Sequence, residues 1–271
     1  MKFSKNISFV TKEIFSNMYL IQRLSAFAFF KQNRDAKLGM LWNILTPSTN
    51  ILTYWLVFGI GLRTGSPKNN IPALPWLICG VCPWYFISQS ISRGSNSIFR
   101  KSGVAAKIKF PLSVIPISEI FTLLYTHIIV LFIAAIVVLA NGVPMGLLAF
   151  QTLYYMLCAL SLMVALSVLT SAISAVNRDF HNLLHSLVRL LFLTTPILWS
   201  IDRMQFPPKV LFIFKLNPVY YIIDGYRESL LYGEALWLHP VRTAYFWAFT
   251  LTLYFVGCNV HVVFRRKFNS M

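Results

Sequence analysis

The sequence predicts an all-α, polytopic membrane protein. Of its 271 residues, 57% are apolar and only 12% are charged, whereas soluble domains average about 45–50% apolar and about 25% charged residues. The mean hydropathy is +0.65, and a soluble chain of this size could not bury so much apolar side chain in one core. We therefore exclude a soluble enzyme, a disordered chain and a disulfide scaffold.

Six apolar stretches have the length of about 20 residues that a bilayer requires. They cover residues 41–62, 73–92, 113–140, 147–176, 183–201 and 241–264. Each is expected to be a helix, because lipid offers no hydrogen-bond partner to a free backbone N–H or C=O. No soluble domain or internal repeat interrupts them, so residues 1–271 are predicted to form a single transmembrane domain.

The basic residues predict the orientation. The chain has 24 Lys and Arg against 8 Asp and Glu, a net charge of +16. With both termini in the cytoplasm, 17 of these cations fall in inner segments and 7 in outer segments. Cytoplasmic loops of membrane proteins carry such an excess. Two cytoplasmic termini are therefore expected, and no nucleic-acid partner is needed to explain the charge.

An amphipathic helix is predicted ahead of the first span, over residues 8–37. Its apolar positions recur at helical spacing, and they are Val10, Ile14, Met18 and Ile21. Lys12 and Arg23 fall on the opposite side. Such a helix can lie in the inner interface with its basic side toward anionic headgroups, and an ordinary juxtamembrane anchor is the alternative.

Two connections have distinctive patterns. The loop at residues 93–110 is short, basic and interrupted by two glycines. The outer connection at 204–234 contains two apolar runs that are too short to span, separated by Asn217 and Pro218. A broken helix at membrane depth must be covered by protein or water. Two short outer-leaflet helices are therefore predicted before the last span.

The sequence contains no recognisable reaction centre. No glycine is followed by lysine, so the phosphate-binding G-x-x-x-x-G-K-[ST] loop is absent. No catalytic grouping is found, and Cys79 and Cys82 lack the second Cys or His pair that a metal site would need. We expect no catalytic, cofactor-binding or metal-binding residue in this chain.

An ion-coupled carrier would need ionisable residues within a span. The third span has Glu119 and His127, which are about 12 Å apart along a helix and cannot pair directly. A water-exposed acid and a hydrogen-bonded histidine are therefore expected rather than a proton relay.

Aromatic residues make up 15% of the chain. Many are expected in the interfacial belts of a membrane protein, but aromatic faces also stack on sugar rings and suit a glycan channel. The candidates for a channel lining are Trp42, Tyr54, Trp84, Tyr85, Phe86, Tyr220 and Tyr221. The sequence alone does not separate belt from channel.

Ordered motifs carry a family resemblance across essentially the whole chain. They are LGMLWNILTP at 38–47, YWLVFG at 54–59, GVCPWYF at 80–86, GSNSI at 94–98, FPLSVIP at 110–116, NRDF at 177–180 and LNPVYYIIDGYR at 216–227. This set resembles the permease subunits of type II ATP-binding-cassette (ABC) exporters for polysaccharides, and within them the wall teichoic acid translocation permeases of Gram-positive bacteria. Export of O-antigen or capsular polysaccharide is the alternative, followed by an ion-coupled carrier and a structural membrane anchor.

The resemblance implies a homodimer with two copies of a separate ATPase, which would bind ATP and Mg²⁺ in place of this chain. It also implies an anionic, polyprenyl-diphosphate-linked substrate that moves outward across a bacterial cytoplasmic membrane.

Residue roles follow from the same resemblance. ATPase coupling would involve the basic residues of the 93–110 loop and the N-terminal helix, namely Arg93, Arg100, Lys101, Lys107, Lys12 and Arg23. The diphosphate headgroup would enter beside Arg34 and Lys37, because cations form strong hydrogen bonds to phosphate. The short outer helices would form a gate, with Pro218, Asp224 and Arg227 as its candidates.

Overall fold

The computed structural model describes residues 2–32, 34, 36–61, 71–107, 110–201, 204 and 206–268. Throughout these ranges the regular elements are helices and no β-strand is present. This confirms the predicted all-α class.

Three helices of the described chain are long and apolar enough to cross a membrane. The first is α6 (Val114–Ala140), and the second is α7 (Gln151–Val176) together with the short η3 (Leu147–Phe150). The third is α11 (Pro240–Phe268), over residues Pro240–Arg265. These helices coincide with the predicted spans at 113–140, 147–176 and 241–264.

Helix α4 (Ala73–Ser95) occupies the centre of the bundle, against α6 and α7. Its 23 residues are enough to span, but Pro, Trp, Ser and Gln residues interrupt the apolar run and make it less hydropathic than the three helices above. Protein covers most of its length, with Leu77, Cys82 and Ile87 fully buried. Because other helices rather than lipid surround α4, it tolerates these polar residues.

The first predicted span is helical over residues 41–61 but consists of several consecutive pieces, and the fifth begins and ends earlier than predicted. In place of 41–62, the chain forms α3 (Trp42–Tyr54), preceded by η1 (Gly39–Leu41) and continued by the π-helical η2 (Trp55–Gly61). In place of 183–201, helix α8 covers Arg178–Thr194. The Asn177 side chain caps its start by accepting from Asp179 N at 2.9 Å. It ends before Pro196, which has no N–H to continue the ladder.

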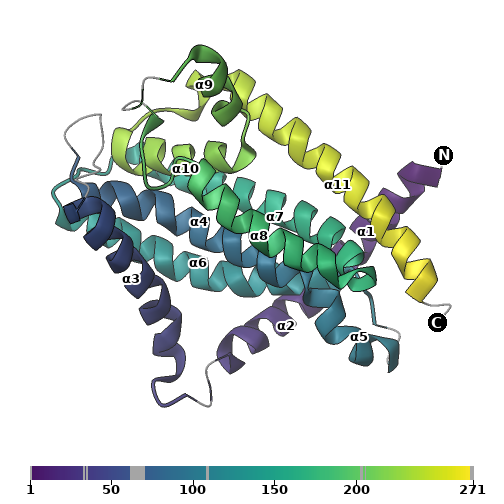
Figure 1. The fold of residues 1–271 in the computed structure, drawn as a ribbon. Coiled ribbons are helices and arrows are strands. Elements are labelled where there is room, and N and C mark those ends of the chain that lie inside the picture. The colour runs from purple at the N-terminus through teal and green to yellow at the C-terminus, as the bar shows by residue number, and fades with distance from the viewer. Residues whose placement is uncertain are drawn as a thin grey trace.

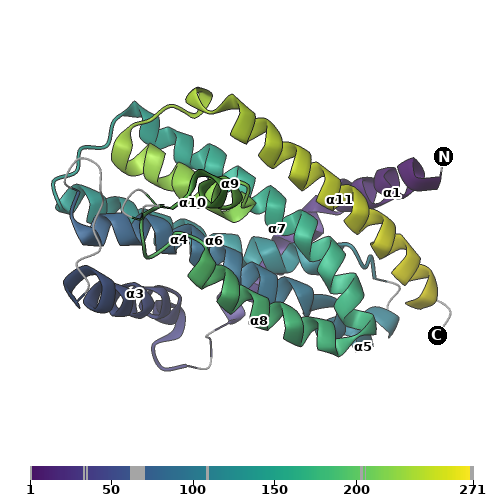
Figure 2. The ribbon, with the colours of Figure 1, turned by 45° about the horizontal axis from the view of Figure 1, so that its top comes forward.

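The N-terminal region forms two helices rather than one. Helix α1 (Lys2–Ser16) ends at Asn17, whose amide side chain donates to the Glu13 carbonyl at 2.7 Å, and α2 (Met18–Lys31) follows. Helix α1 packs against α11, and α2 packs along α6 through Ile21, Ser25 and Phe29. One face of this region is therefore covered by protein. Both chain ends lie at the same end of the bundle as α5 (Ser97–Lys107), as Figure 1 and Figure 2 show.

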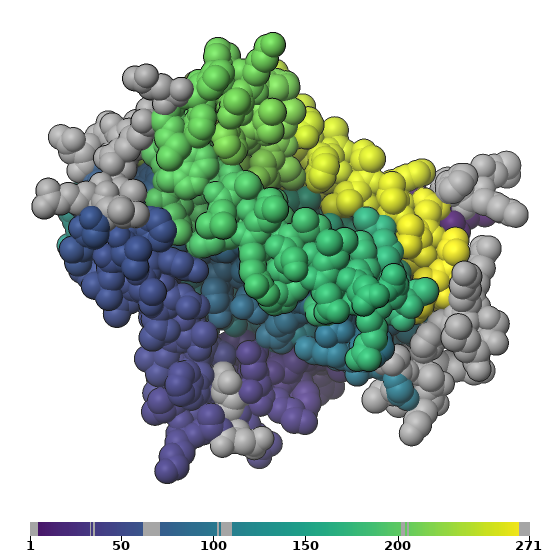
Figure 3. All heavy atoms as spheres, in the orientation of Figure 1, coloured from purple at the N-terminus to yellow at the C-terminus, as the bar shows by residue number. Residues whose placement is uncertain are grey.

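The predicted pair of short helices is present. Helices α9 (Pro208–Lys215) and α10 (Pro218–Arg227) are followed by the π-helical η5 (Glu228–Tyr232) and by η6 (Leu236–Leu238) before α11 begins. In the space-filling view, the green surface around α9 lies beside the yellow α11, away from the C-terminal end (Figure 3). Helix α10 is buried between α4 and α7.

Candidate functional site

A buried carboxylate gathers three of the predicted coupling residues. Glu119 of α6 is only 3% exposed, and its Oε1 accepts from Arg93 Nε at 2.7 Å. Arg100 Nη2 and Lys101 Nζ lie 3.4 and 3.8 Å from its Oε2. We call Arg93, Arg100, Lys101 and Glu119 the Glu119 cluster. It joins the last turn of α4, the first half of α5 and the start of α6.

The end of α4 positions this cluster. Gly94 lies against Ser167 of α7, where a Cβ would come within 3.0 Å of the serine side chain. The Ser97 hydroxyl donates to the Gly94 carbonyl at 2.7 Å, and this satisfies a carbonyl at the helix end. Glycine therefore lets α4 approach α7 closely, and the chain turns into α5 with its cations facing Glu119.

The Glu119 cluster has more positive than negative charge. One carboxylate faces three cations, and the side chains of Arg100 and Lys101 are 45% and 40% exposed. Burial lowers the pKa of Lys101, Glu119 raises it, and the neighbouring Arg100 and Arg93 lower it further. The accessible edge of this cluster therefore presents unneutralised cations to any partner of opposite charge.

Most of the other predicted coupling and headgroup residues belong to the N-terminal segment. Lys12 is exposed on α1, and Arg23 is exposed on α2 with its guanidinium 5.5 Å from the Tyr19 ring centroid. Arg34 and Lys37 are exposed between α2 and α3. The side chain of Lys107 lies outside the described residues.

The start of helix α10 is fixed by its cap. Asn217 Oδ1 accepts from Val219 N at 2.9 Å, and its Nδ2 donates to the Thr195 hydroxyl at 3.0 Å. Pro218 occupies the first turn of α10, where its missing N–H costs no helical hydrogen bond. The same asparagine thus caps α10 and ties it to the residue that follows α8.

Arg227, a predicted gate residue, is buried inside the protomer at 4% exposure. Its Nη1 and Nη2 donate to the carbonyls of Pro196 and Ile197 at 2.8 and 2.6 Å. Its guanidinium lies over the Trp76 ring of α4, and Gly80 leaves the space that the guanidinium fills. Arg227 therefore connects α10, α4 and the segment after α8.

Asp224, the third gate candidate, forms an ion pair with Arg242 of α11 at 2.8 Å. Both residues line a polar cavity of about 200 Å³. Its walls are formed by Trp76, Pro196, Ser200, Ile201, Lys215, Tyr220, Asp224, Arg227, Glu228, Tyr232, Glu234, His239 and Arg242. Arg227 therefore connects α10 to α4, and Asp224 connects α10 to α11.

Most of the predicted channel aromatics belong to the core of the protomer. Trp84, Phe86, Tyr220 and Tyr221 are all less than a tenth exposed. The Tyr221 ring stacks on Phe246 at 4.9 Å between centroids, and Phe86 packs against His127 at 5.0 Å. These four side chains are therefore mostly covered by protein, and their place in a channel lining stays a prediction.

The remaining channel aromatics have accessible surface. Trp42 is 43% exposed on α3. Tyr54 and Tyr85 are half-buried, and Tyr54 packs against Phe192 of α8 at 5.4 Å.

Two polar connections within the bundle have partners that were not predicted. Glu119 is ion-paired and buried, which overturns the expected water-exposed acid. His127 is hydrogen-bonded as expected, through Nε2 to the Tyr226 hydroxyl at 2.7 Å. It thereby links α6 to α10 beside Arg227. Only tertiary structure brings these partners together, since they are 26 and 99 residues apart in sequence.

A further ion pair lies at the end of the bundle that carries both termini. Glu13 Oε1 of α1 binds Arg265 Nη1 of α11 at 2.5 Å, and its Oε2 accepts from the Ser113 hydroxyl at 2.5 Å. The same hydroxyl lies 3.1 Å from His261 Nε2. Sequence analysis missed this group, because its members come from three distant segments.

Comparison with known proteins decides the family. The model of the ABC-2 type transporter family matches residues 19–231, which is more than half of the chain. The chain belongs to the ABC-2 type transporter family. This permease is thus a membrane subunit of a transporter, and the export superfamily expected from the ordered motifs is confirmed.

Three curated relatives are similar to this ABC-2 permease over most of their length. An O-antigen export system permease protein RfbA from Myxococcus xanthus is 27% identical over 206 residues, which cover 75% of this chain and 76% of that protein. Two proteins with the same name from Klebsiella pneumoniae are 24% and 25% identical. They match 88% and 87% of this chain and 86% and 91% of their own lengths.

Proposed function

We propose that this ABC-2 permease exports a lipid-linked O-antigen polysaccharide across a bacterial cytoplasmic membrane, driven by a separate ATPase. The observation that carries the substrate is the name shared by the three relatives, each an O-antigen export permease. Teichoic acid, which the motifs favoured, gives way to the alternative, because none of these relatives is named for it.

The proposed assembly is a homodimer with two ATPase subunits and six spans per permease. Segment α3 with η2, helix α4 and helix α8 complete the set begun by α6, α7 and α11. Two observations support cytoplasmic termini. Both termini and the cationic α5 lie at one end of the bundle (Figure 1), and cytoplasmic segments of membrane proteins are enriched in Lys and Arg.

The Glu119 cluster is the proposed coupling point. Its exposed cations suit an acidic surface of the ATPase, and the buried carboxylate of α6 binds Arg93 of α4 together with Arg100 and Lys101 of α5. A force applied to α5 would therefore move two central helices rather than a loose loop. Lys12, Arg23 and Lys107 stay secondary coupling candidates, and the exposed Arg34 and Lys37 stay candidates for the diphosphate.

We expect the proposed gate to respond to movement of the Glu119 cluster, transmitted along α6. Eight residues separate Glu119 from His127, about 12 Å along α6, and His127 is hydrogen-bonded to Tyr226 of α10. The next residue, Arg227, is bound to carbonyls after α8. Movement of the Glu119 cluster would reach α10 by this route, and release of Arg227 from those carbonyls would free the short outer helices. Pro218, Asp224 and Arg227 thus remain the proposed gate residues.

An ion-coupled carrier is disfavoured by the same geometry. Glu119 forms ion pairs with three cations of α4 and α5, so it joins these helices to α6 instead of lining a path for a coupling ion.

Depletion of the permease in cells tests the proposal. We expect undecorated lipid A at the surface and accumulation of a polyprenyl-diphosphate-linked O-antigen on the cytoplasmic side. Re-expression should restore export in the presence of an uncoupler but not after ATP depletion. Normal export in depleted cells, or restoration that fails with the uncoupler alone, would contradict the proposal. Accumulation of a different lipid-linked glycan would keep the export mechanism and overturn the O-antigen substrate.

A further inference from the structure

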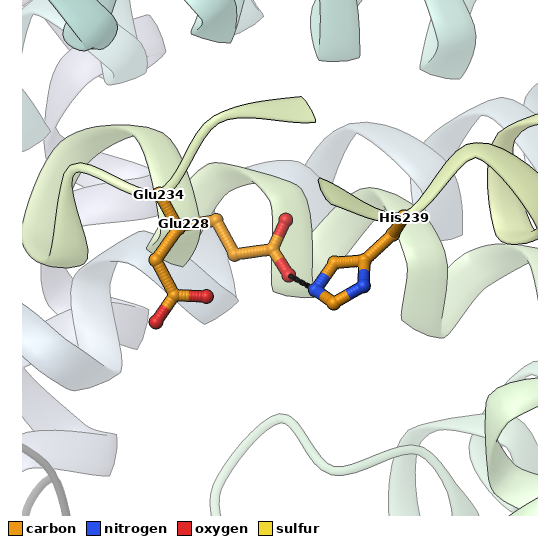
Figure 4. A group of neighbouring side chains, drawn as sticks. All are labelled: Glu228, Glu234 and His239. Atoms are coloured by element: carbon orange, nitrogen blue, oxygen red, sulfur yellow. Dashed lines mark ion pairs between the residues drawn. The ribbon is translucent and has the colours of Figure 1, made fainter. Parts of the chain in front are cut away.

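Three potential metal ligands come together between α10 and α11. They are carboxylate oxygens of Glu228 and Glu234 and a ring nitrogen of His239, all within 4.8 Å of one another. Figure 4 shows the Glu228 carboxylate directed toward the imidazole of His239, with the Glu234 side chain beside it. Glu228 is 7% exposed, whereas Glu234 and His239 are half-buried.

The local backbone brings these residues together. Gly233 ends η5 with a left-handed φ of 62°, a conformation that glycine adopts without a steric cost. The chain then turns back, and Glu234 N donates to the Glu228 carbonyl at 3.0 Å. Two residues that are six positions apart are thereby placed on one side of the turn. His239 follows η6, directly before α11.

Side chains of α7 hold the turn in place. The amide of Gln151 donates to the Glu234 carbonyl at 2.8 Å and accepts from Leu236 N at 2.7 Å. The Tyr155 hydroxyl donates to Glu228 Oε2 at 3.2 Å. These bonds come from α7, outside the turn. They orient Glu228 so that its Oε1 faces His239, just as hydrogen bonds to the ligands of a metal ion hold those ligands in position.

The spacing of the two facing atoms points to a shared ion. Glu228 Oε1 and His239 Nε2 are 3.7 Å apart, which is too long for a hydrogen bond. Two ligands bound to one tetrahedral Zn²⁺ at about 2.0–2.1 Å lie roughly 3.4 Å from each other. An oxygen of the third ligand, Glu234, lies within 4.8 Å of both atoms, and the adjoining polar cavity has room for the water that usually completes an open zinc site.

The charges around the group permit a dication. Arg242 is close, 3.6 Å from Glu228 Oε1, but it binds Asp224 at the shorter distance of 2.8 Å. Arg242 therefore shares its charge between Asp224 and Glu228, and the two carboxylates of the group supply the negative charge that attracts a dication. Lys215 and Arg227 also line the cavity, and Nη1 and Nη2 of Arg227 donate to two backbone carbonyls.

We propose that Glu228, Glu234 and His239 form a site for a divalent transition-metal ion, with Zn²⁺ as its preferred occupant. An imidazole with two carboxylates favours Zn²⁺ over Mg²⁺ or Ca²⁺, which take oxygen ligands. The ion would join η5 and its turn to the start of α11, and so would fasten the short-helix segment to the last predicted span.

Zn²⁺ binding to the purified full-length permease tests this site. The protein carries no histidine tag, is stripped with a chelator, and is titrated with Zn²⁺ alone while the bound metal is measured by equilibrium dialysis. We expect one ion per chain. Glu228→Gln, Glu234→Gln and His239→Ala should each weaken its affinity at least about tenfold, the loss that even outer-shell changes cause.

Matched controls separate this site from adventitious binding. His185→Ala and Asp179→Asn change an exposed histidine and an exposed acid of α8, and both variants should bind Zn²⁺ like the unaltered protein. Glu234→Gln and His239→Ala alter half-buried side chains, so their folding is checked by gel filtration. Absence of binding would overturn the proposal. So would binding that only His239→Ala reduces, because this result indicates a single surface histidine. Neither result depends on the transport function.

Discussion

The guanidinium carbon of Arg227 lies 3.7 Å from the centroid of the Trp76 ring. The arginine comes from the short helix α10 and the tryptophan from the central helix α4, so a cation–π contact joins the predicted gate to the core of the bundle. With the bonds to Pro196 and Ile197, it leaves Arg227 almost fully buried. Arg227 therefore holds α10 in place in this conformation.

Replacing Arg227 should destabilise the permease. Arg227→Ala removes the cation–π contact and leaves two buried carbonyls without donors, a loss of about 2–4 kcal/mol in the free energy of unfolding. Arg227→Lys keeps the charge but cannot form both hydrogen bonds in the same geometry. Its free energy of unfolding should lie between those of the unaltered protein and of Arg227→Ala. Thermal melting of the purified protein measures both. Lys209→Met, at an exposed position of α9, is the control, and equal melting of all variants would contradict the anchoring role.

A methyl group at Gly225 should disturb the packing of α10. The Cβ of Gly225→Ala would overlap the Tyr155 ring, which is itself almost fully buried and cannot move aside. Overpacking of this kind costs about 1–3 kcal/mol. Gly146→Ala is the matched control, because nothing lies within 4 Å of its new Cβ. Melting curves should show a drop only for the first variant, and a drop of the same size in both would argue against this close approach.

Glu119→Gln should separate ATP hydrolysis from export. The neutral amide releases the three cations of the Glu119 cluster, so α5 no longer holds α4 and α6. We expect a complex that still assembles in the membrane and hydrolyses ATP but exports several-fold less glycan.

Charge reversal at Arg100 and Lys101 should weaken ATPase coupling more than membrane insertion. Insertion and coupling that fall together in these variants would show that the cluster only supports folding.

The stability of the permease should depend on the protonation of Glu228. Burial and the neighbouring Asp224 raise the pKa of Glu228 to about 7, against the opposing effects of Arg242 and the Tyr155 hydrogen bond, while Glu234 raises it further. His239 faces the same carboxylate. A carboxyl group with a raised pKa binds more protons in the folded state, so its contribution to stability falls as the pH rises from about 4.5 to 7.

Melting temperatures between pH 5 and 8, in chelator, test this dependence. Glu228→Gln cannot titrate, so its melting temperature should fall less over this range than that of the unaltered protein. His185→Ala should keep the dependence of the unaltered protein. Identical slopes for Glu228→Gln and the unaltered protein would mean that this carboxyl group titrates normally.

The sequence predicted the elements that depend on local composition. The spans at 113–140, 147–176 and 241–264 are long, continuous apolar windows, and the structure has helices over all three. Helix α4 was predicted with nearly correct bounds, but its burial by other helices depends on packing. Helix α8 was displaced in the prediction because its start depends on a side-chain cap at Asn177 and its end on Pro196.

The candidate site was only partly predictable, for a physical reason. The resemblance and the basic loop at 93–110 singled out Arg93, Arg100 and Lys101 as candidates, whereas their buried partner Glu119 could be found only from the tertiary fold. Arg227 was selected as a gate candidate from a motif, but its contacts with Trp76 and two carbonyls are not encoded in local spacing. The group around Glu228 was missed since a glycine turn, not a helical repeat, brings its members together.

The most direct test of the central claim is transport by the permease and its ATPase in proteoliposomes that contain a polyprenyl-diphosphate-linked O-antigen. Movement of the glycan to the opposite leaflet is measured with an impermeant glycosidase or lectin. We predict movement that requires ATP, survives collapse of ion gradients, and falls several-fold with Glu119→Gln. Movement without ATP, or movement that stops when a proton gradient is collapsed, would contradict the account.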